Sequence, residues 1–569
     1  MSRARVAIIV VLLLGLLLLL LRSQAGVVVE PGSTLVVELS GEYIDGPERS
    51  LLASLFGERG TPLASLLSEL AKAERDPRIT QVVMRVGDLQ AGWGKAQEMR
   101  AAFARLRERG RKVVAYLEIE QYGANLEYYV ASAADEIHLT PATRSPFAGL
   151  AAEYLFFGGL FEKIGVDVEY ERIGRYKSAV EAYAESSMSP ANREMANSLL
   201  DSIESQFVTA IAQGRGLTPT RVREIMDAAP TTASELVDAG LADGVTYYDE
   251  LLEAMGDPPV VEASEWAQVD AESLGFEPEA TLALVYGSGP VVTGEGATDR
   301  RGQSVLASRT VADALLDAAE DPEIDGIIFR VDSPGGSALA SDLVWHAVER
   351  AKESEKPLIV SFSDVAASGG YYVASNADSI IAQPATLTGS IGVFVLRPVL
   401  GGLFDKLGVG VESFTRGKHA DLYLSSRPLS PGSRERLRAD VEAIYELFVA
   451  RVAEGRALPT EQVDAVGQGR VWTGEQALER GLVDSLGGLR VAALEARKAL
   501  ELDAEADVAL VPYPPPRPLA EQIQQLLGGS VAAQLLPALP ASLRSLAGLL
   551  QATPAGTPAL VPPLLVEVR

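Results

Sequence analysis

Apolar and polar positions follow two rhythms along most of the chain. Runs rich in β-branched residues, such as 34–46 and 281–292, lead into glycine turns and are typical of buried strands. Between such runs, apolar residues recur at helical spacing, as in 191–213 and 338–354. Strands that alternate with helices in this way predict layered α/β domains with a largely parallel sheet.

The chain also repeats itself. The segment YYVASAADEIHLTPAT at 128–143 returns as YYVASNADSIIAQPAT at 371–386. FEKIGV, which begins at Phe161, returns with the same spacing as FDKLGV, which begins at Phe404. Self-similarity over most of a chain indicates that one structural unit has been duplicated in tandem.

We place the two copies of this domain at 27–265 and 280–490. The remaining residues, 491–569, are predicted to form a C-terminal tail rich in leucine, proline and alanine, in which repeated prolines interrupt any helix from about Pro512 onward. The sequence gives no indication of what this tail does.

The N-terminus is strongly apolar. An unbroken apolar run spans Val6–Leu21 and follows Arg3 and Arg5. As a helix it would measure about 24 Å, slightly less than the roughly 30 Å hydrocarbon core of a bilayer. We expect residues 1–26 to form one transmembrane helix, with the domains on the extracytoplasmic side of a bacterial inner membrane. The small residues at 23–25 leave open that this segment is a cleaved signal peptide.

Composition narrows the chemistry. Acidic residues outnumber basic ones by 77 to 50, for a formal charge of -27, which argues against nucleic acid as a partner. The chain has no cysteine, which excludes a thiol nucleophile, disulfides and thiolate metal sites. A hydrolytic site would therefore have to use another nucleophile.

The second copy contains a candidate nucleophile. In FSDVAASGGYYVAS, small residues around Ser368 let the backbone turn sharply from a strand into a helix and leave the serine hydroxyl near the helix N-terminus. At the matching position the first copy has Asn125, followed by leucine instead of glycine. Only the second copy therefore keeps this candidate.

A glycine pair follows a strand in the second copy, at DSPGG. Backbone N–H groups of glycines can approach a developing oxyanion without obstruction by side chains. We therefore expect the amides of Gly336 and Gly369 to form an oxyanion hole. Read singly, each glycine motif also fits an ordinary strand-to-helix turn.

The sequence does not favour a histidine as the base that would activate Ser368. None of the three histidines lies in a setting typical of a catalytic triad: His138, His346 and His419.

A buried lysine is the other established activator of a serine. Lys177 lies in the sequence IGRYKSAVEAY, where its nearest neighbours, Tyr176 and residues 178–180, are uncharged, which favours it as the base. Lys418 of the second copy is the alternative, although its polar surroundings, TRGKHADLY, indicate a solvated surface residue.

Together these motifs resemble the large, double-domain signal peptide peptidase A family. The resemblance covers roughly residues 34–488 and rests on AASGGYY around Ser368, DSPGG at Asp332, TGSIGV at Thr388 and YKSAVE at Tyr176.

This resemblance implies a tandem duplication of a Clp-protease/crotonase-like domain. It also implies that the first copy supplies Lys177 as the general base and the second copy supplies Ser368 as the nucleophile. Ser390, in TGSIGV, would then orient the lysine.

The resulting functional prediction is a membrane-anchored Ser/Lys-dyad endopeptidase that needs no metal or other cofactor. The resemblance implies cleaved signal peptides and other short hydrophobic peptides as substrates, and a homo-oligomer, expected to be a tetramer. Two alternatives stay open, since a fold does not dictate a function. One is a crotonase-like acyl-transfer enzyme, and the other is a catalytically idle oligomeric membrane scaffold.

Overall fold

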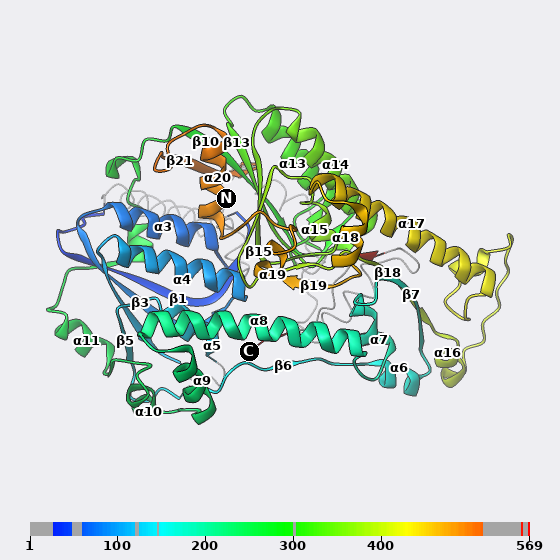
Figure 1. Cartoon of the computed structure of the whole chain (residues 1–569), viewed down its shortest axis with the longest axis horizontal. Helices are drawn as coiled ribbons and strands as arrows, with labels where there is room; N and C mark the ends of the chain where they lie inside the picture. The colour runs from blue at the N-terminus through cyan, green and yellow to red at the C-terminus, as the bar shows by residue number, and fades with distance from the viewer. Residues whose placement is uncertain are drawn as a thin grey trace, which may run out of the picture.

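The computed structural model describes residues 27–47, 60–119, 124–144, 147–299 and 303–515, together with two short strands near the C-terminus. These residues form a mixed α/β structure (Figure 1), as the alternating pattern predicted. The expected transmembrane helix, residues 1–26, lies outside the described residues. Within the described part of the chain, no helix has the length and apolar character needed to cross a membrane.

The first repeat is built on a parallel sheet in the order β2-β1-β3-β4-β5-β8, with β9 also paired to β1. The strands alternate with helices along the chain, and α3 and α4 pack against each other beside the sheet (Figure 1). The principal elements are β1 (Ser33–Ile44), β2 (Thr61–Pro62), α3 (Leu63–Arg75), β3 (Ile79–Gln90), α4 (Trp93–Glu108), β4 (Lys112–Leu117), α5 (Asn125–Ala131), β5 (Glu136–Leu139), β8 (Gly244–Val245) and β9 (Val260–Glu262).

The second repeat has a sheet of the same kind, in the order β19-β17-β15-β13-β10-β21. It is parallel except where β19 runs antiparallel to β17. The principal elements are β10 (Ala280–Ser288), α13 (Ser308–Glu320), β13 (Gly326–Ser333), α14 (Ala338–Lys352), β15 (Leu358–Ala367), α15 (Gly369–Tyr372), β16 (Ser379–Ala382), β17 (Leu387–Gly389), α17 (Pro431–Gly455), β19 (Val471–Thr473), α20 (Leu489–Ala499) and β21 (Val508–Tyr513).

A third sheet takes strands from both repeats. Its order is β12-β11-β14-β22-β18-β7, made of Leu306–Ala307, Val291–Val292, Gly336–Ser337, Ala559–Leu560, Val393–Val399 and Asp167–Ile173 respectively. β7 of the first repeat pairs antiparallel with β18 of the second along its whole length. This pairing carries the residues after β7 to the edge of the second repeat.

The repeats are further joined by the long helix α8 (Pro190–Arg215), which runs from the first sheet toward β19 (Figure 1). Phe207 and Ile211, in its C-terminal half, belong to the hydrophobic core of the first repeat. Met195, near its N-terminus, accepts a hydrogen bond from the amide of Val471 in β19. The helix therefore packs against both repeats and fixes one relative to the other.

Candidate active site

Ser368 lies at the turn between β15 and α15 and is fully buried. Its backbone has φ 56° and ψ −117°, a conformation that costs free energy for a residue with a side chain. Its amide donates to the carbonyl of Gly389 at 2.8 Å, which holds the turn in place. A side chain at Gly370 would collide with the Ser333 carbonyl, so the small residues after Ser368 are a packing requirement.

Lys177 is also fully buried and lies four residues after the end of β7, whose pairing with β18 carries it to the second repeat. Its Nζ lies 2.7 Å from Ser368 Oγ. The same nitrogen donates to the carbonyl oxygen of Ser390 at 2.9 Å and to Ser390 Oγ at 3.0 Å. The structure therefore brings together three of the predicted site residues, two from the second repeat and one from the first.

Burial determines the charge of this amine. Because the side chain has lost its water, the charged form is disfavoured, and the pKa of Lys177 falls well below its ordinary value. The three recorded partners of Nζ are oxygens of serines, and none of them is a carboxylate that would oppose the shift. A neutral amine has two N–H groups for the two Ser390 oxygens and one lone pair for the Ser368 hydroxyl.

A loop around Gly469 closes over the lysine, and the sequence analysis missed it. A side chain at Gly469 would come 2.5 Å from the Lys177 backbone nitrogen and 2.6 Å from its Cβ. The Tyr176 amide donates to the Gln468 carbonyl at 2.8 Å, and the Ser390 amide donates to the Arg470 carbonyl at 2.7 Å. The signal that was available is the sequence Gly-Gln-Gly just before the strand at Val471, which marks a close approach of backbones.

The two glycines expected in the oxyanion hole lie opposite each other. A side chain at Gly369 would come 3.1 Å from the backbone nitrogen of Gly336 and 2.5 Å from Ser341 Oγ. A side chain at Gly336 would collide with the backbone of Val291 in the neighbouring strand. Both positions are therefore restricted to glycine. Gly336 begins β14 of the third sheet, and Gly369 directly follows Ser368 at the start of α15.

The alternative base is elsewhere. Lys418 is exposed, whereas Ser368 and Lys177 are fully buried.

The histidines do not join the site either. His346 is exposed on α14, His138 lies beside Glu136 on β5, and His419 contacts Ser433. Asn125, the counterpart of Ser368 in the first repeat, is buried and donates to the Gly149 carbonyl.

Fold and site together define a duplicated α/β protein with a buried serine–lysine pair that spans its two repeats. Comparison with known proteins gives the family. Peptidase family S49 matches at 105–260 and again at 350–503, once in each repeat. The chain belongs to this family and, with it, to the serine proteases.

Several relatives share most of the length of the chain. "Serine protease SPPA, chloroplastic" from Arabidopsis thaliana is 34% identical over 88% of this chain and 74% of its own. "Protease 4" from Salmonella typhi is 29% identical over 90% of this chain and 84% of its own. A protein from Enterococcus faecium whose name includes "signal peptide peptidase SppA" is 35% identical over 30% of this chain and 49% of its own.

Among solved structures, a membrane-bound stomatin-specific protease is 16% identical and aligns with 41% of this chain and 99% of its own, at a TM-score of 0.27. That similarity is too low to carry an argument. Membership of the family rests on the sequence matches.

Proposed function

We propose that the chain is an endopeptidase in which Ser368 is the nucleophile and Lys177 is the general base. The observation that carries the proposal is the buried contact of 2.7 Å between Lys177 Nζ and Ser368 Oγ. An amine with a depressed pKa can accept a proton near neutral pH, which a solvated lysine cannot do.

In this mechanism, the Ser368 O–H proton moves to Lys177 Nζ while Oγ forms a bond to the peptide carbonyl carbon. The amides of Gly336 and Gly369 donate to the oxyanion of the tetrahedral intermediate. The lysine then returns its proton to the leaving amine nitrogen as the C–N bond breaks. In the second half, Lys177 takes a proton from a water molecule while the water oxygen attacks the acyl carbon. Lys177 then returns the proton to Ser368 Oγ as the acyl C–O bond breaks, which releases the acid product and regenerates both residues. Ser390 holds the amine in line throughout.

Peptide binding is supported by the strand β22. This segment pairs antiparallel with β14 at Gly336 and with β18 at Phe394, so an extended backbone fits between the two strands beside the glycine pair. Addition of a strand to a sheet edge is a common way to hold a peptide. It favours a protease over the acyl-transfer alternative, because an acyl thioester has no peptide backbone to pair with these strands.

The substrate class and the setting belong to the same proposal. We propose short hydrophobic peptides, including cleaved signal peptides, as substrates, and a membrane anchor formed by residues 1–26. The apolar run at the N-terminus supports the anchor. The name of the Enterococcus faecium relative supports the substrate class.

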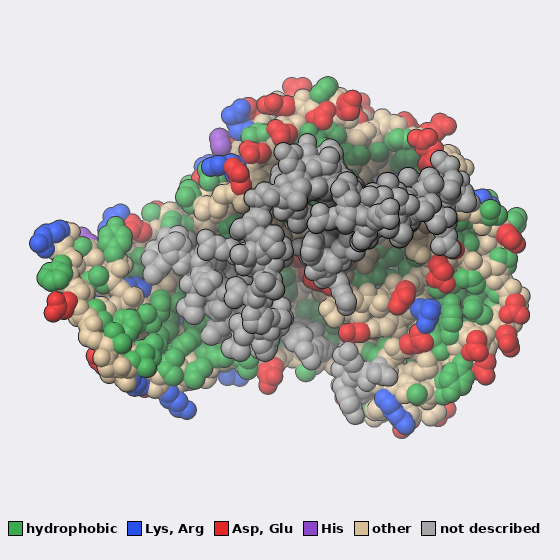
Figure 2. Space-filling model, turned by 180° about the vertical axis from the view of Figure 1, so that it is seen from behind, with side chains coloured by type: hydrophobic (Ala, Val, Ile, Leu, Met, Phe, Trp, Pro, Cys, Tyr) green, Lys and Arg blue, Asp and Glu red, His purple; other side chains and the backbone are tan. Residues whose placement is uncertain are grey.

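A homo-oligomer, a tetramer in the proposal, is supported by exposed apolar side chains at the end of the molecule that carries α6 (Gly158–Ile164) and α16 (Gly401–Leu407). Figure 2 shows hydrophobic side chains gathered at this end. Large exposed apolar patches often mark contact surfaces between proteins or with membranes. The exposed residues include Leu160, Ile164, Leu407, Val409, Val411, Phe414 and Tyr423.

The deciding experiment compares wild type with Ser368→Ala, Lys177→Ala and Lys418→Ala in detergent. Hydrolysis of a fluorogenic hydrophobic peptide should be lost in the first two variants and kept in the third. A fluorophosphonate probe should label wild type at Ser368, which an idle scaffold would not do. Hydrolysis that survives Ser368→Ala would overturn the proposed function.

A further inference from the structure

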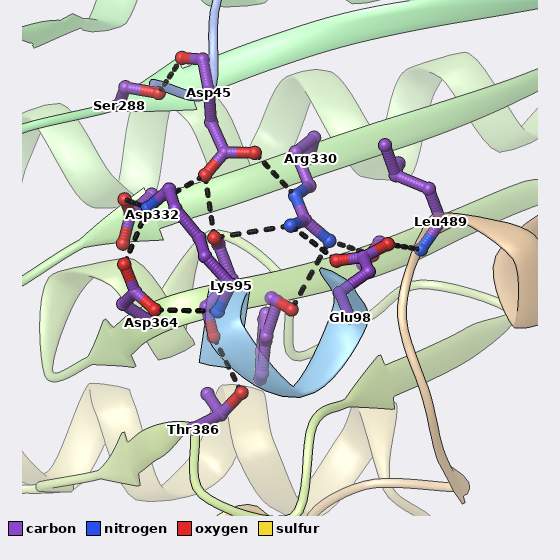
Figure 3. A network of polar contacts seen from close by, with 12 residues as sticks. Asp45, Lys95, Glu98, Ser288, Arg330, Asp332, Asp364, Thr386 and Leu489 are labelled. Atoms are coloured by element: carbon purple, nitrogen blue, oxygen red, sulfur yellow. Dashed lines mark hydrogen bonds and ion pairs between the residues drawn. The ribbon is translucent and has the colours of Figure 1, made fainter. Parts of the chain in front are cut away.

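Buried and partly buried charged side chains cluster where the first repeat meets the strands that carry the active site (Figure 3). Lys95 and Glu98 come from α4, and Asp45 follows β1. Arg330 and Asp332 come from β13, and Asp364 comes from β15. The mechanism proposed above uses none of these residues.

Lys95 is the centre of this cluster. Its side chain is 4% exposed, and its Nζ lies 2.5 Å from Asp332, 2.6 Å from Asp364 and 3.0 Å from Asp45. Burial alone would lower the pKa of Lys95, but the three carboxylates outweigh it and raise the pKa well above the ordinary value. Lys95 is therefore a fixed positive charge, in contrast to Lys177.

Two of the carboxylates that contact Lys95, those of Asp332 and Asp364, lie at a register shift in the second sheet. Between the pairs Val331–Phe362 and Ser333–Ala366, β15 advances by four residues while β13 advances by two, so that β15 bulges outward. Asp364 lies in this bulge, and Asp332 lies opposite it. Asp332 also accepts a hydrogen bond of 3.1 Å from the Val365 amide, which fastens the bulge to β13.

The bulge determines how the two halves of the site face each other. Ser368 lies four residues after Asp364, at the turn that follows β15, and Gly336 lies four residues after Asp332, at the start of β14, which follows β13. A strand without the bulge would shift this register and move the serine away from the glycine amide. Lys95 bridges the carboxylates of Asp332 and Asp364, the residues that precede Gly336 and Ser368 in the two segments.

The N-terminus of α4, in the first repeat, packs against the bulge and places Lys95 there. The amides of Gly92 and Lys95, at the N-terminus of α4, donate to the Asp364 carboxylate at 3.1 Å and 2.8 Å. A side chain at Gly94 would come 2.6 Å from the Ser363 carbonyl, and one at Gly92 would collide with Asp364. The sequence Gly-Trp-Gly-Lys thus lets the helix end dock directly onto the bulge.

We propose that Lys95 is a positioning residue for the serine site, which holds the bulge of β15 so that Ser368 faces the amide of Gly336. The inference rests on the proposed function, since it concerns the same site. In this proposal, the first repeat contributes two lysines to the site that differ in protonation state. Lys177 is neutral and exchanges a proton, whereas Lys95 is charged and fixes the distance between strands.

The test compares Lys95→Met with Glu98→Gln in the full-length protein. Glu98 is a matched control, because it lies one turn further along α4 in the same interface. It pairs with Arg330 at 2.8 Å and accepts from the Leu489 amide, and it contacts neither Asp332 nor Asp364. The measurements are kcat and KM for a fluorogenic peptide, the rate of fluorophosphonate labelling and the thermal midpoint of unfolding.

We expect Lys95→Met to lower kcat and the labelling rate together, by about tenfold to a hundredfold, with KM changed by less than about threefold. Glu98→Gln should lower the thermal midpoint but leave kcat within about twofold of wild type. The double variant Lys95→Met/Asp364→Asn removes one carboxylate charge that has lost its cation, and the asparagine keeps one oxygen to accept from one of the two α4 amides. It should regain stability and keep the low kcat.

Recovery of kcat in the double variant would overturn the inference, because it would show that Lys95 only neutralises charge. A folded Lys95→Met enzyme with wild-type kcat would overturn it as well. In either case the proposed function stands as long as Ser368→Ala is inactive. Activity in Ser368→Ala would instead remove the proposed function itself.

Discussion

The protonation state of Lys177 can be measured without any substrate. The structure buries this amine completely, with serine oxygens as its recorded partners, so the folded protein should hold it neutral. In the unfolded chain it has the ordinary pKa of about 10.4 and is protonated at neutral pH. Unfolding should therefore take up a proton at this one site.

The magnitude and sign follow from linkage. Because the folded pKa is depressed, the unfolded state binds more protons in the window between the folded pKa and about 10.4. Stability therefore rises with pH in this window, by about 1.4 kcal/mol per pH unit for one proton, and falls again as pH decreases. Lys177→Met removes this dependence, and below about pH 10.4 it should make the folded protein more stable, at the expense of activity.

The assay is proton uptake on unfolding in guanidinium at about pH 8.5, followed with an indicator dye in weak buffer. Wild type should take up about one proton per chain more than Lys177→Met, while Lys418→Met, at an exposed position, should match wild type. Equal uptake by wild type and Lys177→Met would show that Lys177 is already charged when folded. A charged lysine cannot act as the base, so this result would refute the reasoning.

Three further predictions follow from the site. Peptide hydrolysis should rise as pH increases through the depressed pKa of Lys177, because only the neutral amine accepts a proton; a rate that stays constant from mildly acidic to mildly alkaline buffer would contradict this. Gly469→Ala should lower kcat by about tenfold or more, because its side chain would displace Lys177. Gly410→Ala is the control and should leave kcat unchanged, because Gly410 has open space around it. Equal effects of the two substitutions would argue against close packing of Gly469 on Lys177. Deleting residues 516–569 should lower KM for peptides, because β22 would no longer occupy the edge between β14 and β18; an unchanged KM would mean that β22 does not compete with substrate.

The sequence was sufficient for the fold class because that information is local and repeated. Strand and helix periodicity predicted the mixed α/β structure, and the recurrence of 128–143 at 371–386 predicted the duplication, which the two matches to peptidase family S49 confirm. The family prediction is confirmed in the same way. The membrane anchor and the catalytic roles of Ser368 and Lys177 stay predictions.

The remaining features depend on contacts between segments far apart in the sequence. Lys95 meets Asp332 and Asp364 only because the two repeats dock, and its local sequence reads as the start of an ordinary helix. Gly469 meets Lys177 because β7 joins a sheet of the other repeat. A single sequence can mark a close approach of backbones, as Gly-Gln-Gly does before Val471, but it does not indicate which distant segment is approached.

The pairing of β7 with β18 determines when, during folding, the contact between Lys177 and Ser368 can form. The amine is synthesised first, 191 residues ahead of the hydroxyl that it contacts, and neither half of the chain holds both groups. In a nascent or half-folded chain, Lys177 and Ser368 are therefore not yet in contact, so this pair could not cleave the exposed backbone of its own chain. On the proposed mechanism, activity would begin only when the two repeats have closed on each other, so completion of folding would itself be the activation step.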